Sequence, residues 1–138
     1  MNMLKVVDEI KKCEVTSLKV SRMLVEEGFP TGYANYARIE CKGSNIILAD
    51  LTISDDDMSE YGIKEGYLKP AFDVYVMNKY LLSRGNVFMK KERDIYEVRL
   101  EANDCSELYF GSARYLPDAM GMCMLNYIRA KKVEDGKD

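Results

Sequence analysis

The residues that could carry chemistry in this chain are carboxylates, lysines, tyrosines and cysteines, because the sequence contains no histidine. A Ser-His-Asp triad, a Cys-His pair and a His-Glu-x-x-His zinc site are therefore excluded. General acid–base catalysis would have to use the remaining titratable side chains. We expect no cofactor and a protein that is not an enzyme.

The cysteines do not form a metal site. No pair has Cys-x-x-Cys spacing, so the usual zinc ligands are missing. We predict free thiols in a reducing cytosol, most simply buried ones. The four are Cys13, Cys41, Cys105 and Cys123.

The first candidate site is an acidic cluster made of Asp55, Asp56, Asp57 and Glu60. It does not fit an EF-hand loop, because positions counted from Asp57 that need oxygen ligands fall on Tyr61 and Leu68. Three interpretations remain open. The cluster is the solvated first turn of a helix, a loose Mg²⁺ site, or a patch that imitates nucleic-acid phosphates and occupies a basic groove of another protein.

The second candidate site is a basic segment with aromatic neighbours. Residues 84–99 contain five cations and three acids, a local charge of +2. Such a segment can bind a nucleotide or a single strand through phosphate charge and base stacking. The competing interpretation is a solvated sheet face. The predicted ligand-binding residues are Arg84, Phe88, Lys90, Lys91, Arg93 and Tyr96.

Two further features predict a protein interface. The chain has ten tyrosines and no tryptophan, and Tyr33 and Tyr36 fall in an expected loop. Tyrosine suits interfaces because it offers contact area with few rotatable bonds and a polar tip. The stretch Tyr115–Lys132 is rich in methionine, and Met120 and Met124 would give it a pliable surface, such as a dimer interface. The alternative is a helix packed tightly on its own sheet, in which Gly121 permits close approach of another backbone.

An α+β domain must position these residues. Helical spacing of apolar residues predicts helices over 3–13, 16–28, 54–62, 70–84 and 116–132, with a strand over 14–20 as an alternative to the second. Period-two alternation predicts a hairpin over 36–54, turning at 42–45, and a strand over 94–104, and we expect neighbouring strands over 87–89 and 107–113. Thr16 is expected to cap the second helix, and Pro70 to lie in the first turn of the fourth.

This order of elements predicts a single α+β domain over 1–138. We expect an antiparallel β-sheet packed with helices in an α/β/α-type sandwich, followed by a frayed tail at 133–138.

The net charge and the hydropathy of the chain argue against two classes of protein, general nucleic-acid binders and membrane proteins. The net charge of −3 does not fit a general nucleic-acid binder, whose domain charge is normally positive. No apolar run is long enough to span a bilayer, and Lys5, Asp8 and Glu9 interrupt any signal-peptide core. We therefore expect a cytoplasmic protein that does not bind membranes.

The C-terminal half, residues 66–132, resembles the phage ABA sandwich domain. The resemblance is carried by a helix at Phe72–Leu82, a stop at Arg84-Gly85, strands across Val87–Phe110, and a small-residue segment, Gly111–Pro117, that leads into a helix rich in Ala and Cys. Two departures are the absence of tryptophan and the presence of Tyr115 where the family more typically has threonine. The resemblance implies a phage or prophage accessory protein that works in a bacterial host cell and has no catalytic residues.

We therefore expect an accessory protein that acts by binding. The leading hypothesis is an inhibitor of a host defence system that occludes a host protein and forms a homo-oligomer such as a dimer. The first alternative is a protein that sequesters a small nucleotide signal. The second is a carboxylate-dependent metal enzyme built on Asp55–Asp57.

Overall fold

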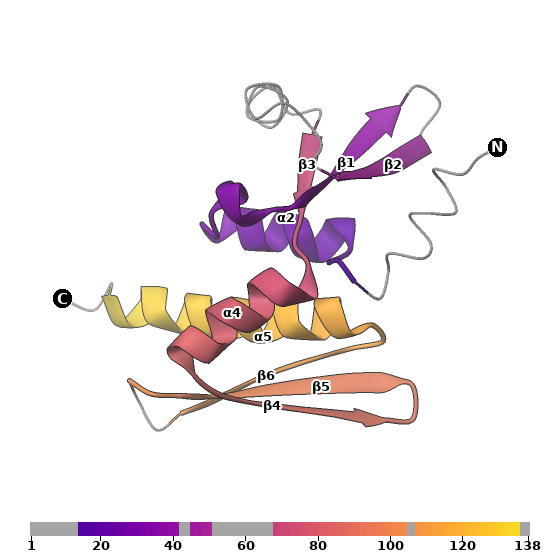
Figure 1. Ribbon diagram of the computed structural model, residues 1–138. Helices are drawn as coiled ribbons and strands as arrows, with labels where there is room; N and C mark the ends of the chain where they lie inside the picture. Colours follow the sequence, from indigo (N-terminus) through magenta and orange to yellow (C-terminus); the bar gives the residue numbers. More distant parts are fainter. Residues whose placement is uncertain (1–13, 42–44, 51–67, 105–106, 136–138) are drawn as a thin grey trace.

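The computed structural model describes residues 14–41, 45–50, 68–104 and 107–135 (Figure 1). The predicted helices over 3–13 and 54–62 lie outside these residues, as does the hairpin turn except for its last residue. The start of the predicted tail differs from expectation, because residues 133–135 continue the last helix.

The α+β class is confirmed. Two antiparallel sheets of three strands each are present, with orders β2-β1-β3 and β4-β5-β6. The first contains β1 (Tyr36–Cys41), β2 (Asn45–Asp50) and β3 (Leu68–Ala71), and the second contains β4 (Gly85–Glu92), β5 (Ile95–Ala102) and β6 (Leu108–Ala113). The helical elements are α2 (Leu18–Glu26), a short 3₁₀ turn η2 (Thr31–Tyr33), α4 (Val74–Arg84) and α5 (Leu116–Asp135).

The layers differ from the predicted α/β/α order. Helices α4 and α5 lie on one face of the β4-β5-β6 sheet, α2 packs on α5, and the β2-β1-β3 sheet lies beyond α2 (Figure 1). Helices thus lie between two sheets, in place of one sheet between helices. Strand β3 was not predicted, because it is only four residues long and contains Pro70.

The entry into α2 uses a different cap from the predicted one. The helix prediction is confirmed over the strand alternative, but the hydroxyl that accepts from the Val20 amide belongs to Ser17, not Thr16. Thr16 instead joins α2 to the end of β3. Its amide donates to the Phe72 carbonyl at 2.9 Å, and its hydroxyl accepts from the Phe72 amide at 3.0 Å. The buried Arg38 of β1 donates to the Thr16 carbonyl at 2.7 Å.

Helix α4 begins later than predicted. Asp73 is its N-cap and accepts from the Val76 amide at 2.9 Å. Pro70 lies in β3, opposite Ala37 of β1. The missing amide of proline is tolerated there because β3 is at the edge of its sheet.

Helix α5 is packed on two sides through glycines. Gly111 of β6 faces the helix so closely that a Cβ there would overlap the Ala119 carbonyl and the Cys123 amide. Gly121 of α5 faces α2, and a Cβ there would lie 2.5 Å from a methyl of Val20. The close neighbour of Gly121 is therefore a side chain of another helix, not a sheet backbone.

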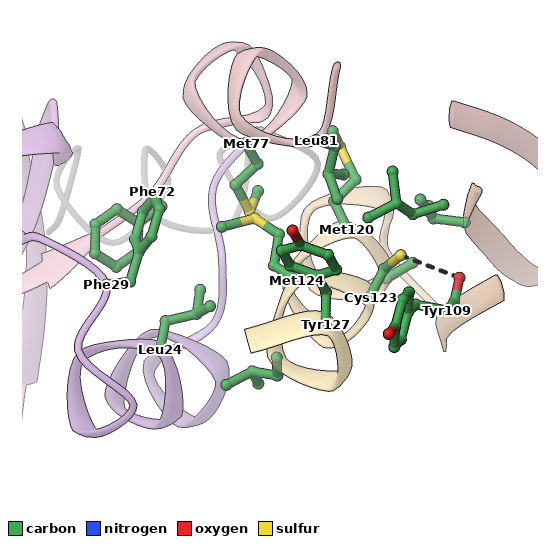
Figure 2. Close-up of a cluster of buried hydrophobic side chains, with 14 of the residues drawn as sticks. Leu24, Phe29, Phe72, Met77, Leu81, Tyr109, Met120, Cys123, Met124 and Tyr127 are labelled. Atoms are coloured by element: carbon green, nitrogen blue, oxygen red, sulfur yellow. Dashed lines mark hydrogen bonds between the residues drawn. The ribbon is translucent and has the colours of Figure 1, made fainter. Parts of the chain in front are cut away.

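Methionines Met120 and Met124 are fully buried, which corrects the prediction that they form a protein-interaction surface. They lie in the main core beside Leu24, Phe72 and Met77 (Figure 2). Because α5 contacts α2 and α4 as well as the sheet, even the sides of the helix that looked like flanks in the sequence are covered.

Cys123 is a buried free thiol, as predicted for the cysteines as a group. Its Sγ contacts the Tyr109 carbonyl at 3.4 Å (Figure 2). Burial raises the pKa of this thiol to about 12. Since the thiolate is the nucleophile, Cys123 is chemically silent near neutral pH.

The Gly111 contact predicts a large effect of one added methyl group. Gly111→Ala forces Cβ against backbone atoms that cannot rotate away, so we expect a loss of at least about 3 kcal/mol in unfolding free energy. Gly32→Ala is the matched control, because no atom lies within 4 Å of its added Cβ. Urea denaturation followed by circular dichroism measures both variants. Equal stabilities of the two variants would contradict the close packing of α5 on β6.

The raised pKa of Cys123 predicts protection from thiol reagents. In a variant with Cys13, Cys41 and Cys105 changed to serine, only Cys123 can react. At pH 8 the thiolate fraction is about one in ten thousand for a pKa near 12. We expect no reaction with a chromogenic disulfide in buffer and full reaction in denaturant. Rapid labelling of the folded variant would show that Cys123 is accessible.

Candidate functional site

The sheet β4-β5-β6 has one face that no described element covers. Val98 and Leu100 of β5 point toward the helices and are fully buried. Side chains alternate along a strand, so residues of the other parity point to the opposite face. We call this the outer face.

Strand register places two phenylalanines on either side of one arginine on the outer face. Phe88 pairs with Arg99, and Arg99 pairs with Phe110. The two phenylalanines are 44% and 45% exposed, which is high for apolar rings. We call Phe88, Arg99 and Phe110 the aromatic row.

Arg99 has no polar partner of its own in the described part of the chain. Its guanidinium carbon lies 4.5 Å from the centroid of the Phe88 ring. Its Nε is buried and has no hydrogen-bond partner among the described residues. Buried polar atoms are normally hydrogen-bonded, so this atom requires an explanation.

The charges around the aromatic row do not favour a polyanion. Lys90 and Glu97 form an ion pair at 3.8 Å, and their side chains are 62% and 41% exposed. By register the outer face carries two cations and three acids, namely Lys90, Arg99, Glu92, Glu97 and Glu101. A surface with more acid than base repels a phosphate backbone.

The six predicted ligand-binding residues are not brought together. Arg84 ends α4, and Lys90, Lys91 and Arg93 lie at the far end of the β4–β5 hairpin. Six residues of extended strand separate Arg84 from Lys90, which corresponds to about 20 Å. Phe88 belongs to the outer face, whereas Tyr96 lies on the helix-facing side, where its ring packs against the core.

The hairpin end holds its charges in local contacts. The Lys91 ammonium lies 5.2 Å from the centroid of the Tyr96 ring. Arg93 has a φ of 58°, a left-handed conformation that fits a tight turn. Lys90, Glu92, Arg93, Ile95 and Glu97 line a hollow of about 270 Å³, in which acids and bases are mixed.

Two residues from different predicted sets meet in a groove. Tyr33, predicted for a protein interface, and Arg84, predicted for a ligand, both line a cavity of about 400 Å³ between η2 and α4. None of the other lining residues was predicted as a site residue, and they include Tyr75, Lys79 and Tyr80.

The remaining predicted residues divide into structural ones and ones that lie outside the described chain. Tyr36, the first residue of β1, is half-buried against Val15 and Ala71, so it packs in a small second core. The acidic cluster Asp55, Asp56, Asp57 and Glu60 lies outside the described residues. Its three interpretations therefore stay predictions.

In the part of the chain that the structure describes, no group of three Cys, Asp or Glu side chains is placed to hold a metal ion. No described helix combines the length and the hydropathy that crossing a bilayer requires.

Comparisons with known protein families, with curated proteins and with solved structures found no match to this chain. The resemblance of residues 66–132 to the phage ABA sandwich domain therefore stays a prediction.

The sequence contained part of the information needed to predict the aromatic row and the groove. Residues 88, 99 and 110 are evenly spaced, but only the register of two hairpins makes them neighbours. Tyr75 and Lys79 are four residues apart in a helix, which places them on one exposed side.

The unpaired Nε of Arg99 predicts that this arginine does little for the fold. Arg99→Met keeps much of the packing on Phe88 and removes an unsatisfied polar atom, so unfolding free energy should stay within about 1 kcal/mol of the parent. Arg38→Met is the matched control, because it leaves a buried carbonyl without its charged donor and should cost about 1.5–3 kcal/mol. Urea denaturation compares the two. Equal losses would mean that Arg99 has a structural partner.

Proposed function

We propose that the protein acts by binding another protein through the outer face of the β4-β5-β6 sheet. The observation that carries this proposal is the aromatic row, in which Arg99 lies between two exposed phenylalanines with its Nε buried and unpaired. Within the described residues, the guanidinium has only the Phe88 ring as a neighbour for its charge. A partner carboxylate can accept hydrogen bonds from the terminal guanidinium nitrogens, because the buried Nε cannot be reached from outside.

The chemistry of the row fits a protein partner. Aromatic residues and arginine are enriched where interfaces are fully desolvated, and they carry much of the binding energy. A carboxylate from the partner can form charge-assisted hydrogen bonds with the guanidinium while apolar groups cover Phe88 and Phe110. The expected partner segment therefore presents an Asp or Glu side chain between apolar side chains.

The surrounding charges favour this partner over a nucleic acid. The ion pair of Lys90 with Glu97 and the excess of acids leave no continuous positive path for a phosphate chain. Charges of both signs at the rim suit a polar interface border, where they set orientation and association rate.

The biological role that we propose comes from the resemblance to the phage ABA sandwich domain. The protein is then a phage or prophage accessory protein in a bacterial cytoplasm, and it inhibits a host defence system by occluding a host protein. The acidic cluster Asp55–Asp57 with Glu60 is a further surface for that purpose. A nucleotide ligand is the second candidate, and a different part of the molecule, the groove between η2 and α4, supports it.

Native mass spectrometry of protein purified gently from a bacterial host tests the proposal. We expect a host protein retained at fixed stoichiometry by the parent chain and by Arg22→Met, an exposed arginine on α2. Arg99→Met should reduce the retained fraction at least about ten-fold, since a desolvated charged hydrogen bond is worth more than about 1.4 kcal/mol. Hydrogen exchange should show protection of β4, β5 and β6 in the complex.

The other outcomes decide against occlusion. A second copy of this chain held through the aromatic row, and released by Arg99→Met, would replace the host protein with a homodimer. Retention that is the same in Arg99→Met and Arg22→Met would place binding elsewhere on the molecule. A monomer without any bound protein would contradict both a host-protein partner and a homodimer.

A further inference from the structure

The groove between η2 and α4 lies on the opposite side of the β4-β5-β6 sheet from the outer face, because α4 covers the inner side (Figure 1). Its volume of about 400 Å³ falls within the range of small-molecule sites. One wall comes from Pro30 and Tyr33, and the other from residues of α4.

Two tyrosine rings are exposed at this groove. Tyr75 is 67% exposed and Tyr33 is 54% exposed, although both are large rings on an ordered backbone. The Tyr33 ring is tilted against Phe29, with centroids 5.5 Å apart. Phe29 also meets Tyr80 edge to face at 5.4 Å, so two of the three tyrosines that line the groove rest on one buried ring. The walls are therefore formed before a ligand binds.

Every charged residue that lines the groove is a cation. The Lys79 ammonium lies 5.2 Å from the centroid of the Tyr75 ring, and the Arg84 guanidinium lies 4.8 Å from that of Tyr80. Neither forms an ion pair with a described residue. Two cations in a groove that also presents two exposed tyrosine rings are complementary to a planar ring that carries an anionic group.

We infer that this groove binds a nucleoside phosphate. The base stacks on the exposed tyrosines, Tyr75 and Tyr33, and the phosphate accepts hydrogen bonds from Lys79 and Arg84. Stacking on aromatic side chains is the usual way in which unpaired bases are held, and Arg and Lys are the usual phosphate partners. This inference is independent of the proposed protein partner, which uses the opposite side of the sheet.

The arrangement also changes which cations matter for a nucleotide. Of the predicted basic residues, only Arg84 belongs to the groove. Lys90, Lys91 and Arg93 lie at the hairpin end, where Lys90 already pairs with Glu97. The second cation of the groove is instead Lys79, which contacts the ring of Tyr75 one helical turn earlier.

Isothermal titration calorimetry with adenosine and guanosine 5′-monophosphates tests the inference. We expect at least one of them to bind the parent protein. The nucleosides adenosine and guanosine should bind at least about ten-fold more weakly, because they lack the phosphate that the two cations bind. Inorganic phosphate alone should also bind at least about ten-fold more weakly, because it lacks the base that stacks on the tyrosines.

Substitutions then locate the site. Lys79→Met and Tyr75→Ala change exposed side chains, so both should fold normally and weaken binding at least about ten-fold. Arg84→Met should do the same. The matched control is Lys90→Met, which removes a cation of the hairpin and should leave the affinity unchanged.

Four results would overturn the inference. One is the absence of binding by both nucleotides. Another is equal affinity of the parent, Lys79→Met and Tyr75→Ala. The third is loss of nucleotide binding in Lys90→Met while Lys79→Met still binds, which would place the binding site at the β4–β5 hairpin. Inorganic phosphate that binds as tightly as the nucleotides would show an anion site without base recognition.

Discussion

The close packing of α5 on β6 and on α2 is the constraint on which the rest of the structure depends. Gly111 of β6 lets the helix backbone lie directly on the sheet, and Gly121 lets α2 approach from another side. A side chain at Gly111 would force the sheet away, and one at Gly121 would displace Val20. A glycine inside a helix costs about 1 kcal/mol relative to alanine, so its presence requires compensation by burial elsewhere. That compensation is the core around Met120, Met124 and Leu125, all of which are fully buried.

Both candidate binding surfaces follow from this packing. Because the helices occupy one face of the β4-β5-β6 sheet, the aromatic row remains on the other. Across the helices, edge-to-face ring contacts connect Tyr109 of β6 to Tyr127 of α5 at 5.3 Å and Tyr127 to Tyr80 of α4 at 6.4 Å. Phe29 continues the series to Tyr33 and also meets the buried Phe72. The core thus extends as a series of ring contacts to the wall of the groove, and this positions Tyr33 without a contribution from a ligand.

The sequence predicted the helices and strands better than it predicted which of them pack against each other. Period-two alternation identified β5 and β6 because Val98, Leu100 and Tyr109 face a core while their neighbours do not. The glycine in the last helix correctly indicated close approach, but local spacing cannot say which element approaches, so Met120 and Met124 resembled a pliable surface. Thr16 and Ser17 are chemically equivalent as caps, and only the contact of Thr16 with Phe72 separates their roles. The acidic cluster Asp55–Asp57 gave the clearest local charge pattern, yet charge alone does not distinguish a helix turn from an interface.

Location, not local charge, decides what the basic residues can do. The +2 charge of residues 84–99 suggested one phosphate site, but the fold divides these cations among a helix end, a hairpin tip and the outer face. Lys90 pairs with Glu97, whereas Arg84 lies over the Tyr80 ring at the groove. Arg99 is different from both. A buried guanidinium nitrogen without a partner lowers stability, and the ring of Phe88 offsets only part of that cost. Since an apolar residue of similar length would pack on Phe88 without this cost, the fold alone does not account for an arginine at position 99, whereas a partner acceptor for the terminal guanidinium nitrogens does.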